Sequence, residues 1–403
     1  MILRELQSSL REVGSGPDRW ILLLLFLFLL SIPFSIFAAQ VGYFGALIIW
    51  VGTMAVRRES DGVRTGFEMF FLLYLAAELI STLLSSNTAQ SFLYMQRRML
   101  LIPILYLLLA KVKSRSAITA LLSMMLLAAL GVALWSFRDL FINFSGYLAF
   151  QRRLSEFQMY MTAGGIMMIV ALVIIPFVLH RETPTRFRWT AVLVLVPVLV
   201  NLLFTFTRSS WLGLIGGALV IGLRRHRKVL LPLLVILGMV VALSSPEMKD
   251  RMSSAFDPSH PNNVSRVHMW EVGWGMFLDH PLFGIGDIGT EQLWDRYSEP
   301  GWPSEGHLHN NVIMWMVTLG LTGSLVLISL FVALWRRLWE IEKLVHQDWL
   351  LGSLLLGGLG VMTGFHINGM FEWNFGDAEI MMLLWSVTGL SLAAGRMTEG
   401  DGK

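Results

Sequence analysis

Long apolar segments recur along almost the whole chain and predict a bundle of membrane-spanning helices. Twelve such segments lie at residues 20–38, 42–56, 67–85, 93–110, 117–137, 159–180, 189–206, 210–223, 229–244, 310–335, 349–368 and 378–395. A full crossing needs about 20 predominantly apolar residues, and the segments at 42–56 and 210–223 are shorter than this. The predicted fold class is an all-α polytopic membrane protein with about 12 transmembrane helices.

One long polar segment, residues 245–309, separates the ninth and tenth predicted helices. Within it VSRVHMWEVGWGMFLD predicts an amphipathic helix, because Arg266, Trp270 and Trp274 follow one another at the i, i+4, i+8 spacing of a helical face. The next stretch, HPLFGIGDIG, ends this helix with a proline and three glycines. We therefore expect three parts: helices one to nine in 1–244, a loop domain in 245–309, and helices ten to twelve with a tail in 310–403.

Positive charges alternate along the chain as membrane topology requires. If the N-terminus is cytoplasmic, every segment predicted to face the cytoplasm holds at least two Lys or Arg, and these segments contain 21 of the 31 basic residues. Both termini are then cytoplasmic, and residues 245–309 lie outside. Arg4, Arg11 and Arg19 before an apolar run resemble a signal peptide, but the run is long, so we interpret it as a first span.

The amino-acid composition excludes several classes of protein and of catalytic site. The chain is 55% hydrophobic and 15% charged, whereas a soluble domain has about a quarter charged residues. It has no cysteine, which excludes disulfides, thiolate catalysis and cysteine-ligated zinc. No HExxH motif or carboxylate cluster is present, so we predict no metal and no cofactor. The basic clusters HRETPTRFRW and RRHRK fall in predicted cytoplasmic segments, where they determine topology and do not indicate a nucleic-acid site.

The remaining basic residues gather at the outer face, and most of them are arginine. They are Arg97, Arg98, Arg138, Arg152, Arg153, Arg208, Lys249, Arg251, Arg266 and Arg296. The planar guanidinium fork suits phosphate oxygens. The outer face is therefore predicted to bind phosphate.

Three motifs on this face carry candidate chemistry. TFTRSSWLGL places Arg208 at the outer end of the seventh predicted helix, SRVHMWEVGW places Arg266 on the outer loop, and GHLHNNVIMW places His309 before the tenth. With the twelve spans, these motifs resemble the O-antigen ligase and polymerase superfamily, membrane glycosyltransferases of class C type. The resemblance depends on Arg-x-x-x-Leu at 208–212, on HPLFGIG, and on His-Asn followed by an apolar run that ends in GLTG. It covers roughly residues 200–395.

The resemblance implies an O-antigen ligase of the bacterial inner membrane. Such an enzyme transfers a polysaccharide from an undecaprenyl diphosphate donor to the lipid A core oligosaccharide at the periplasmic face. The residues fit that chemistry, since arginines can stabilise a departing diphosphate and a histidine can take the proton of the acceptor hydroxyl. His309 is the predicted base, Arg208 and Arg266 are the predicted diphosphate-binding residues, and Arg98 and Arg97 are further candidates.

Two other functions remain open. A polymerase would use a second lipid-linked glycan as its acceptor. A transporter of lipid-linked glycans would need polar groups along a path through the bilayer, whereas here they cluster at the outer ends of the helices. The predicted partners are the lipid-linked donor, the lipid A core acceptor and membrane lipids, with no nucleic acid.

Each candidate also has a structural interpretation. His309 could bond to a backbone carbonyl, Arg208 could extend to the interface, and Arg266 could be a surface charge. Asn310 is predicted to cap the tenth helix, with a substrate contact as the alternative. His307 lies two residues before His309 and is a possible participant.

Further polar and aromatic residues have two interpretations. Trp270 and Trp274 could anchor the loop at the interface or pack against the polyprenyl chain. In FEWNFGDAE, Glu372, Asn374 and Asp377 could line the acceptor site or cap the last helix.

Glu78 and Arg98 reach similar depths on two helices joined by a short loop, which predicts an ion pair between them, because an intramembrane carboxylate is costly without a partner. We expect this pair to orient Arg98 toward the donor.

Overall fold

The structure is a computed structural model that describes residues 2–58, 61–149, 152–155, 157–225, 227 and 257–400. Every regular element in these residues is a helix. The α-helices are α1 (Ile2–Val13), α2 (Pro17–Ser31), α3 (Ile36–Arg57), α4 (Glu68–Leu84), α5 (Thr88–Met99), α6 (Pro103–Lys111), α7 (Arg115–Ile142), α8 (Phe144–Leu148), α9 (Tyr160–Leu179), α10 (Thr185–Phe204), α11 (Arg208–Arg225), α14 (Pro261–Asp279), α15 (Trp294–Tyr297), α16 (Asn311–Val345), α17 (Leu351–Asn368) and α18 (Ala378–Gly400). Two short 3₁₀ helices, η1 (Thr290–Gln292) and η2 (Asn374–Gly376), lie in loops.

Within this described part, 8 helices are long and apolar enough to cross a membrane. They are α3, α7, α9, α10, α16, α17, most of α18, and α5 with α6 taken as one stretch, Thr88–Lys111. Three other predicted spans, 20–38, 67–85 and 210–223, form α2, α4 and α11, which are shorter or more polar. The predicted ninth span, 229–244, lies outside the described residues, as do Lys249 and Arg251.

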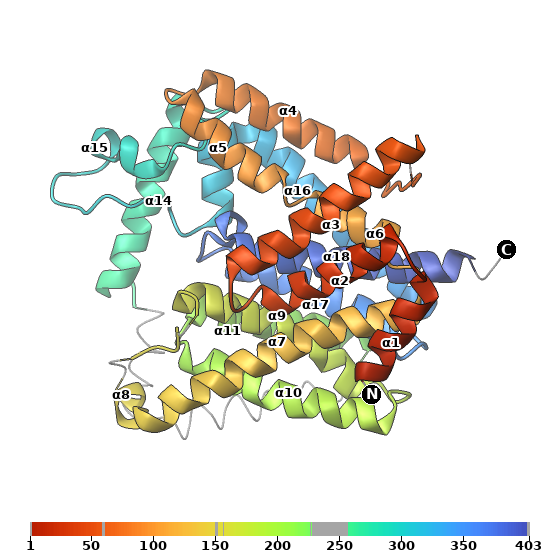
Figure 1. The fold of residues 1–403 in the computed structure, drawn as a ribbon. Helices are drawn as coiled ribbons and strands as arrows, with labels where there is room; N and C mark the ends of the chain where they lie inside the picture. Colours follow the sequence, from red (N-terminus) through yellow and green to blue (C-terminus); the bar gives the residue numbers. More distant parts are fainter. Residues whose placement is uncertain are drawn as a thin grey trace.

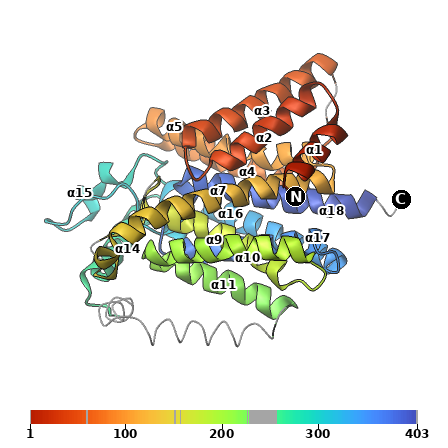
Figure 2. The ribbon, with the colours of Figure 1, turned by 60° about the horizontal axis from the view of Figure 1, so that its bottom comes forward.

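Two predicted boundaries are wrong, and proline explains both. The segment 20–38 is not one helix, because α2 ends at Ser31, Pro33 follows, and Ser35 caps α3 by accepting a hydrogen bond from the Ala38 amide at 3.3 Å. Residues 36–41 therefore belong to the next helix, and α2 and α3 lie side by side (Figures 1 and 2). The segment 93–110 is interrupted before Pro103, which starts α6.

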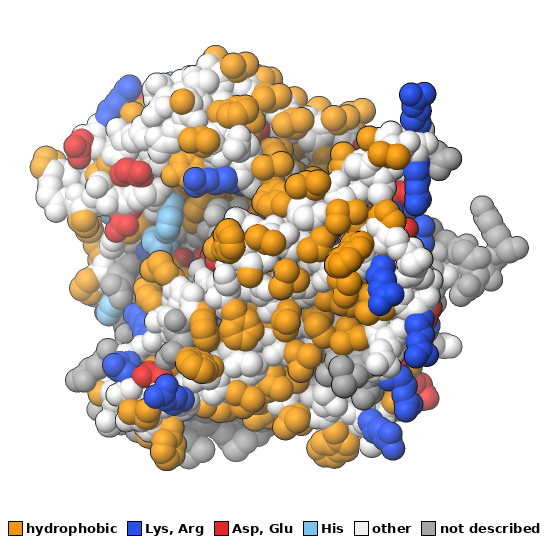
Figure 3. All heavy atoms as spheres, viewed as in Figure 1, with side chains coloured by type: hydrophobic (Ala, Val, Ile, Leu, Met, Phe, Trp, Pro, Cys, Tyr) orange, Lys and Arg blue, Asp and Glu red, His pale blue; other side chains and the backbone are white. Residues whose placement is uncertain are grey.

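The two ends of the helix bundle differ in their side chains and their elements. At one end Lys111 pairs with Asp18 at 3.0 Å and Asp61 at 2.9 Å, and Arg115 pairs with Asp348. We call this the basic end. Figure 3 shows Lys and Arg along the edge where the C-terminus lies, and a broad hydrophobic band beside it. The opposite side carries α14 and α15 in both ribbon views (Figures 1 and 2), and we call it the α14 end.

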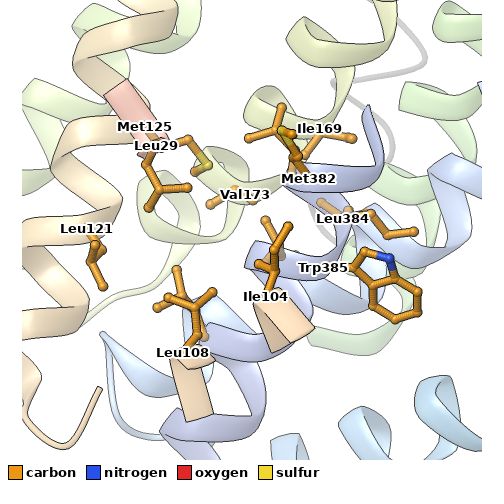
Figure 4. Close-up of a cluster of buried hydrophobic side chains, with 14 of the residues drawn as sticks. Leu29, Ile104, Leu108, Leu121, Met125, Ile169, Val173, Met382, Leu384 and Trp385 are labelled. Carbon is orange, nitrogen blue, oxygen red and sulfur yellow. The ribbon is translucent and has the colours of Figure 1, made fainter. Parts of the chain in front are cut away.

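The apolar interior joins helices from the whole chain. Figure 4 shows side chains of α2, α6, α7, α9 and α18 meeting in one cluster that includes Leu29, Ile104, Met125, Val173 and Trp385. Such contacts exclude lipid and give each helix a fixed neighbour.

Helix α17 packs directly on the backbone of α11. A Cβ atom at Gly217 would lie 2.5 Å from the Gly360 carbonyl oxygen, and one at Gly364 would lie 2.8 Å from the Gly213 oxygen. Small residues allow such close approach between membrane helices. This contact fixes the start of α11 relative to the loop that follows α17.

Helix α16 is broken at Gly320, which has φ 64° and ψ −166°. The segment 281–286, which we call the insertion segment, lies against the break. The Ile285 amide donates to the Val317 oxygen at 2.9 Å, and the Leu321 amide donates to the Pro281 oxygen at 2.8 Å. The HPLFGIG and GLTG motifs are therefore in direct backbone contact.

Candidate functional site

The site is built around the start of α16. Asn310 caps this helix, since its side-chain oxygen accepts from the Val312 amide at 2.9 Å and the Ile313 amide at 3.1 Å. The predicted cap is thus confirmed. The Asn310 amide nitrogen also donates to the Met370 oxygen at 2.9 Å, which ties the helix start to the loop after α17.

That loop is held by a second asparagine. The backbone amide of Asn311 donates to the Gly369 oxygen at 2.7 Å, and its side-chain oxygen accepts from the Phe375 amide at 3.1 Å. The Asn311 side-chain amide donates to the Asn374 side chain. Asn311 and Asn374 are both buried. Their hydrogen bonds hold the loop after α17 against the start of α16 and so fix the position of Glu372.

Glu372 connects His309 with Arg266. One carboxylate oxygen lies 2.9 Å from Nδ1 of His309, and the other accepts from Nη2 of Arg266 at 3.1 Å. A carboxylate on Nδ1 favours the tautomer with a proton on that nitrogen, which leaves Nε2 able to accept a proton. His309 has a positive φ of 47°, which is uncommon in a non-glycine residue but more frequent for histidine than for most others.

Arg208 begins α11 immediately after a tight turn in which Phe206 has φ 51°. Burial, and then the positive charges of Arg266 and Arg153, lower the pKa of the Arg208 guanidinium. The fold therefore brings Arg208 near enough to Arg266 for their charges to repel, and Arg266 shares Glu372 with His309.

His307 lies against His309 with ring centroids 4.3 Å apart. Burial, followed by repulsion from His309, lowers the pKa of His307 to about 4, so it is neutral at ordinary pH. Its Nδ1 is buried without a hydrogen-bond partner among the described residues.

Arg98 lies in a separate cluster. It pairs with Glu78 at 2.9 Å, which confirms the predicted ion pair, and with Asp287, the residue directly after the insertion segment. None of these described partners belongs to the His309 cluster. Arg97 is exposed and lies over the Tyr94 ring at 5.4 Å. Diphosphate binding by Arg97 and Arg98 stays a prediction, and the contacts favour a structural role for Arg98.

Several candidates support the site without reaching its centre. Trp270 donates from Nε1 to the Leu308 oxygen at 3.1 Å, so it holds the segment that precedes His309. Trp274 is 52% exposed, as expected of an interfacial residue. Asp377 accepts from the Ile380 amide at 3.0 Å and thus caps the last helix, one of its two predicted roles.

Two interactions between residues were not predicted from the sequence. Asp287, a lone acid among glycines, could have been noticed as a partner for Arg98. Arg153 approaches Arg208, and its place in the RR pair before the sixth predicted span was the available signal. Within the described residues, no group of three or more His, Asp or Glu is placed to hold a metal ion.

Fold and site together define a multi-pass helical membrane protein with an Arg–Glu–His cluster at one end of its bundle. Residues 191–328 match the family described as O-antigen ligase, so the chain carries a domain of that family and the resemblance drawn from the sequence is confirmed. The matched stretch contains Arg208, Arg266 and His309 and ends before Glu372.

A curated protein of Rickettsia bellii (strain RML369-C), named "Putative polysaccharide ligase", is 23% identical over 235 residues that cover 55% of each chain. The chain thus spans about half the length of the curated relative that it matches.

Proposed function

We propose that the protein is an O-antigen ligase that transfers a polysaccharide from undecaprenyl diphosphate to the lipid A core oligosaccharide. The reaction takes place at the α14 end, which faces the periplasm of a bacterial inner membrane, and both termini are cytoplasmic. The observation that carries this proposal is the shared carboxylate of Glu372, bonded to His309 and to Arg266 beside Arg208.

The proposed reaction is a single displacement. The acceptor hydroxyl oxygen attacks the anomeric carbon of the donor sugar, the bond from that carbon to the diphosphate oxygen breaks, and the hydroxyl proton passes to Nε2 of His309. Glu372 holds the ring and stabilises the imidazolium that forms. Arg208 and Arg266 stabilise the charge that develops on the departing diphosphate without a metal ion. A single displacement inverts the anomeric configuration.

The ligase is favoured over the polymerase because the matched family and the relative are both named as ligases. The two activities share donor and chemistry and differ in the acceptor. The transporter alternative lacks this support, and a transporter would not need a base next to the arginines.

The decisive experiment compares the wild-type protein with His309→Asn. Asparagine tolerates the left-handed backbone and can donate to Glu372, but it cannot take a proton. Purified protein is incubated with an undecaprenyl-diphosphate glycan and either lipid A core or a second donor molecule.

We expect the wild type to glycosylate lipid A core and His309→Asn to be slower by roughly 10²–10⁴-fold. Product formed only on the second donor would identify a polymerase. Full activity of His309→Asn would exclude the base role, and no product with either acceptor would favour transport.

A further inference from the structure

A groove of about 670 Å³ lies between the start of α4 and the second half of α16. Farther along the same two helices, the buried Ser81 side chain donates to the backbone oxygen of Thr318, which is also buried, so α4 and α16 are in direct contact there. The groove is at the basic end, since Asp61, shortly before α4, pairs with Lys111 at that end. Clefts of about 300–1,000 Å³ are the size in which proteins bind small molecules.

The apolar part of the groove belongs to the surface that faces lipid. Phe67 and Phe70, at the start of α4, form one wall, and Val332 and Ala333 of α16 form the other. Val332 is 51% exposed, and Leu325, two turns earlier on α16, is 53% exposed. Exposed apolar side chains on a membrane-spanning helix lie in hydrocarbon, because contact with water would be costly for them. An acyl chain can therefore enter the groove sideways from the bilayer.

The polar part of the groove is positively charged. Arg336, Arg337 and Glu340 line it, two cations and one anion with a net charge of +1. Arg336 is exposed and lies one turn beyond Val332 on the same face of α16. A guanidinium binds phosphate oxygens through its planar fork, and basic pockets between membrane helices bind anionic lipid head groups. The groove thus places a phosphate-binding group next to an apolar wall.

The start of α4 does not supply this attraction for anions. Glu68 accepts hydrogen bonds from the Thr65 amide and, at 3.0 Å, from the Gly66 amide. These amides at the start of the helix are therefore already bonded within the protein. The attraction for a phosphate in the groove depends on the arginines of α16.

We propose that this groove binds an anionic phospholipid from the leaflet that borders the basic end. Its phosphate lies against Arg336 and Arg337, and one acyl chain packs between Phe70 and Val332. The bound lipid bridges α4 and α16 and stabilises the native protein by mass action. This inference is independent of the proposed transfer reaction, which takes place at the α14 end.

The test measures the melting temperature of the purified full-length protein in detergent as phosphatidylglycerol is added. Phosphatidylcholine with the same acyl chains keeps the phosphate but has no net charge, and glycerol 3-phosphate keeps a charged head group without the chains. We expect a saturable rise in Tm with phosphatidylglycerol alone. An equal rise with phosphatidylcholine would show that the groove accepts any lipid, and an equal rise with glycerol 3-phosphate would show that it binds free phosphates. Either result would overturn the proposal.

Substitutions locate the effect in the groove. Arg336→Gln should weaken phosphatidylglycerol binding about fivefold, as expected for one basic residue near a lipid surface. Arg186→Gln is the matched control, since it removes an exposed arginine from the start of α10, away from the groove, and should leave the affinity unchanged. Equal effects of these two substitutions would overturn the proposal.

A third variant tests the shape of the groove separately from its charge. Ala333→Phe fills the apolar part and keeps both arginines, so phosphatidylglycerol binding should weaken. A Tm equal to that of the wild type without added lipid shows that this variant is folded. Binding of phosphatidylglycerol to folded Ala333→Phe with wild-type affinity would show that the acyl chain does not occupy the groove, which would also overturn the proposal.

Discussion

Glu372 binds two different side chains through its two carboxylate oxygens, and neither contact alone would give it this double role. One oxygen orients His309 and the other restrains Arg266. A carboxylate bonded on both sides can favour proton transfer to the ring while it keeps an arginine near the leaving group. Glu372 is thus a positioning residue for both halves of the proposed reaction.

Replacing Glu372 tests this double role. Glu372→Gln keeps the shape but removes the charge, so one of the two donors loses its acceptor. Loss of a charged hydrogen bond corresponds to about 1.5–3 kcal/mol, so we expect transfer to fall roughly 10- to 100-fold in kcat. Steady-state kinetics with a lipid-linked donor measures the effect. An unchanged kcat with a raised donor KM would limit Glu372 to substrate binding.

His307 gives the protein a pH-dependent contribution to stability. Its pKa is about 4 in the folded protein because of burial, while an unfolded histidine titrates near 6.5. Between these values the unfolded chain binds a proton that the native protein does not, so His307 makes stability rise with pH.

The measurement is the melting temperature of wild type and His307→Gln from pH 4 to 7. We expect the wild-type Tm to fall more steeply below pH 6.5 than that of the variant, which cannot titrate. Parallel Tm curves for the two proteins would show that His307 makes no such contribution.

At the scale of the elements, the sequence predicts helices and contacts between neighbouring helices, but not contacts between distant loops. The helix from Pro261 to Asp279 follows from its amphipathic pattern, and its end follows from Pro281. The Glu78–Arg98 pair could be predicted because a short hairpin fixes the depth of both residues. The contact of Glu372 with His309 could not, since hydrophobic patterns do not tell which distant loops meet.

The break in α16 explains why the HPLFGIG and GLTG motifs occur together, because the two motifs are in contact there. Gly320 adopts a backbone region that essentially only glycine occupies, and a Cβ there would lie 2.4 Å from the Leu282 carbonyl carbon. The insertion segment replaces helical hydrogen bonds at the break. It also leads to Asp287, which pairs with Arg98 and links the break to α5.

Gly320→Ala should therefore displace the insertion segment. We expect a loss of about 1–3 kcal/mol in stability, observed as a lower Tm, together with reduced transfer. Gly52→Ala on the exposed face of α3 is the control, because no atom lies within 4 Å of the new methyl group. A Tm for Gly320→Ala equal to that of the control would contradict this account of the break.

At the scale of the whole molecule, α11 and α16 connect the two ends of the bundle. At the α14 end, α11 begins with Arg208 and α16 begins beside His309. At the basic end, Arg224 and Arg225 of α11 both pair with Glu342 of α16, at 2.8 and 2.6 Å. Glu342 is 1% exposed, so this cluster fixes the spacing of the helices that carry the proposed catalytic groups.

Glu342→Gln should consequently affect both stability and transfer, although it lies far from the site along α16. Removing one partner of a buried ion cluster leaves uncompensated charge and costs about 3–5 kcal/mol when burial is complete, and less here because Arg225 is 28% exposed. We expect a lower Tm and a reduced kcat, with donor affinity less affected. The matched control is Glu340→Gln, an exposed glutamate two residues earlier on the same helix. If both variants behave as the wild type, the spacing of α11 and α16 does not depend on their basic ends, and the packing of α11 on α17 alone must place Arg208.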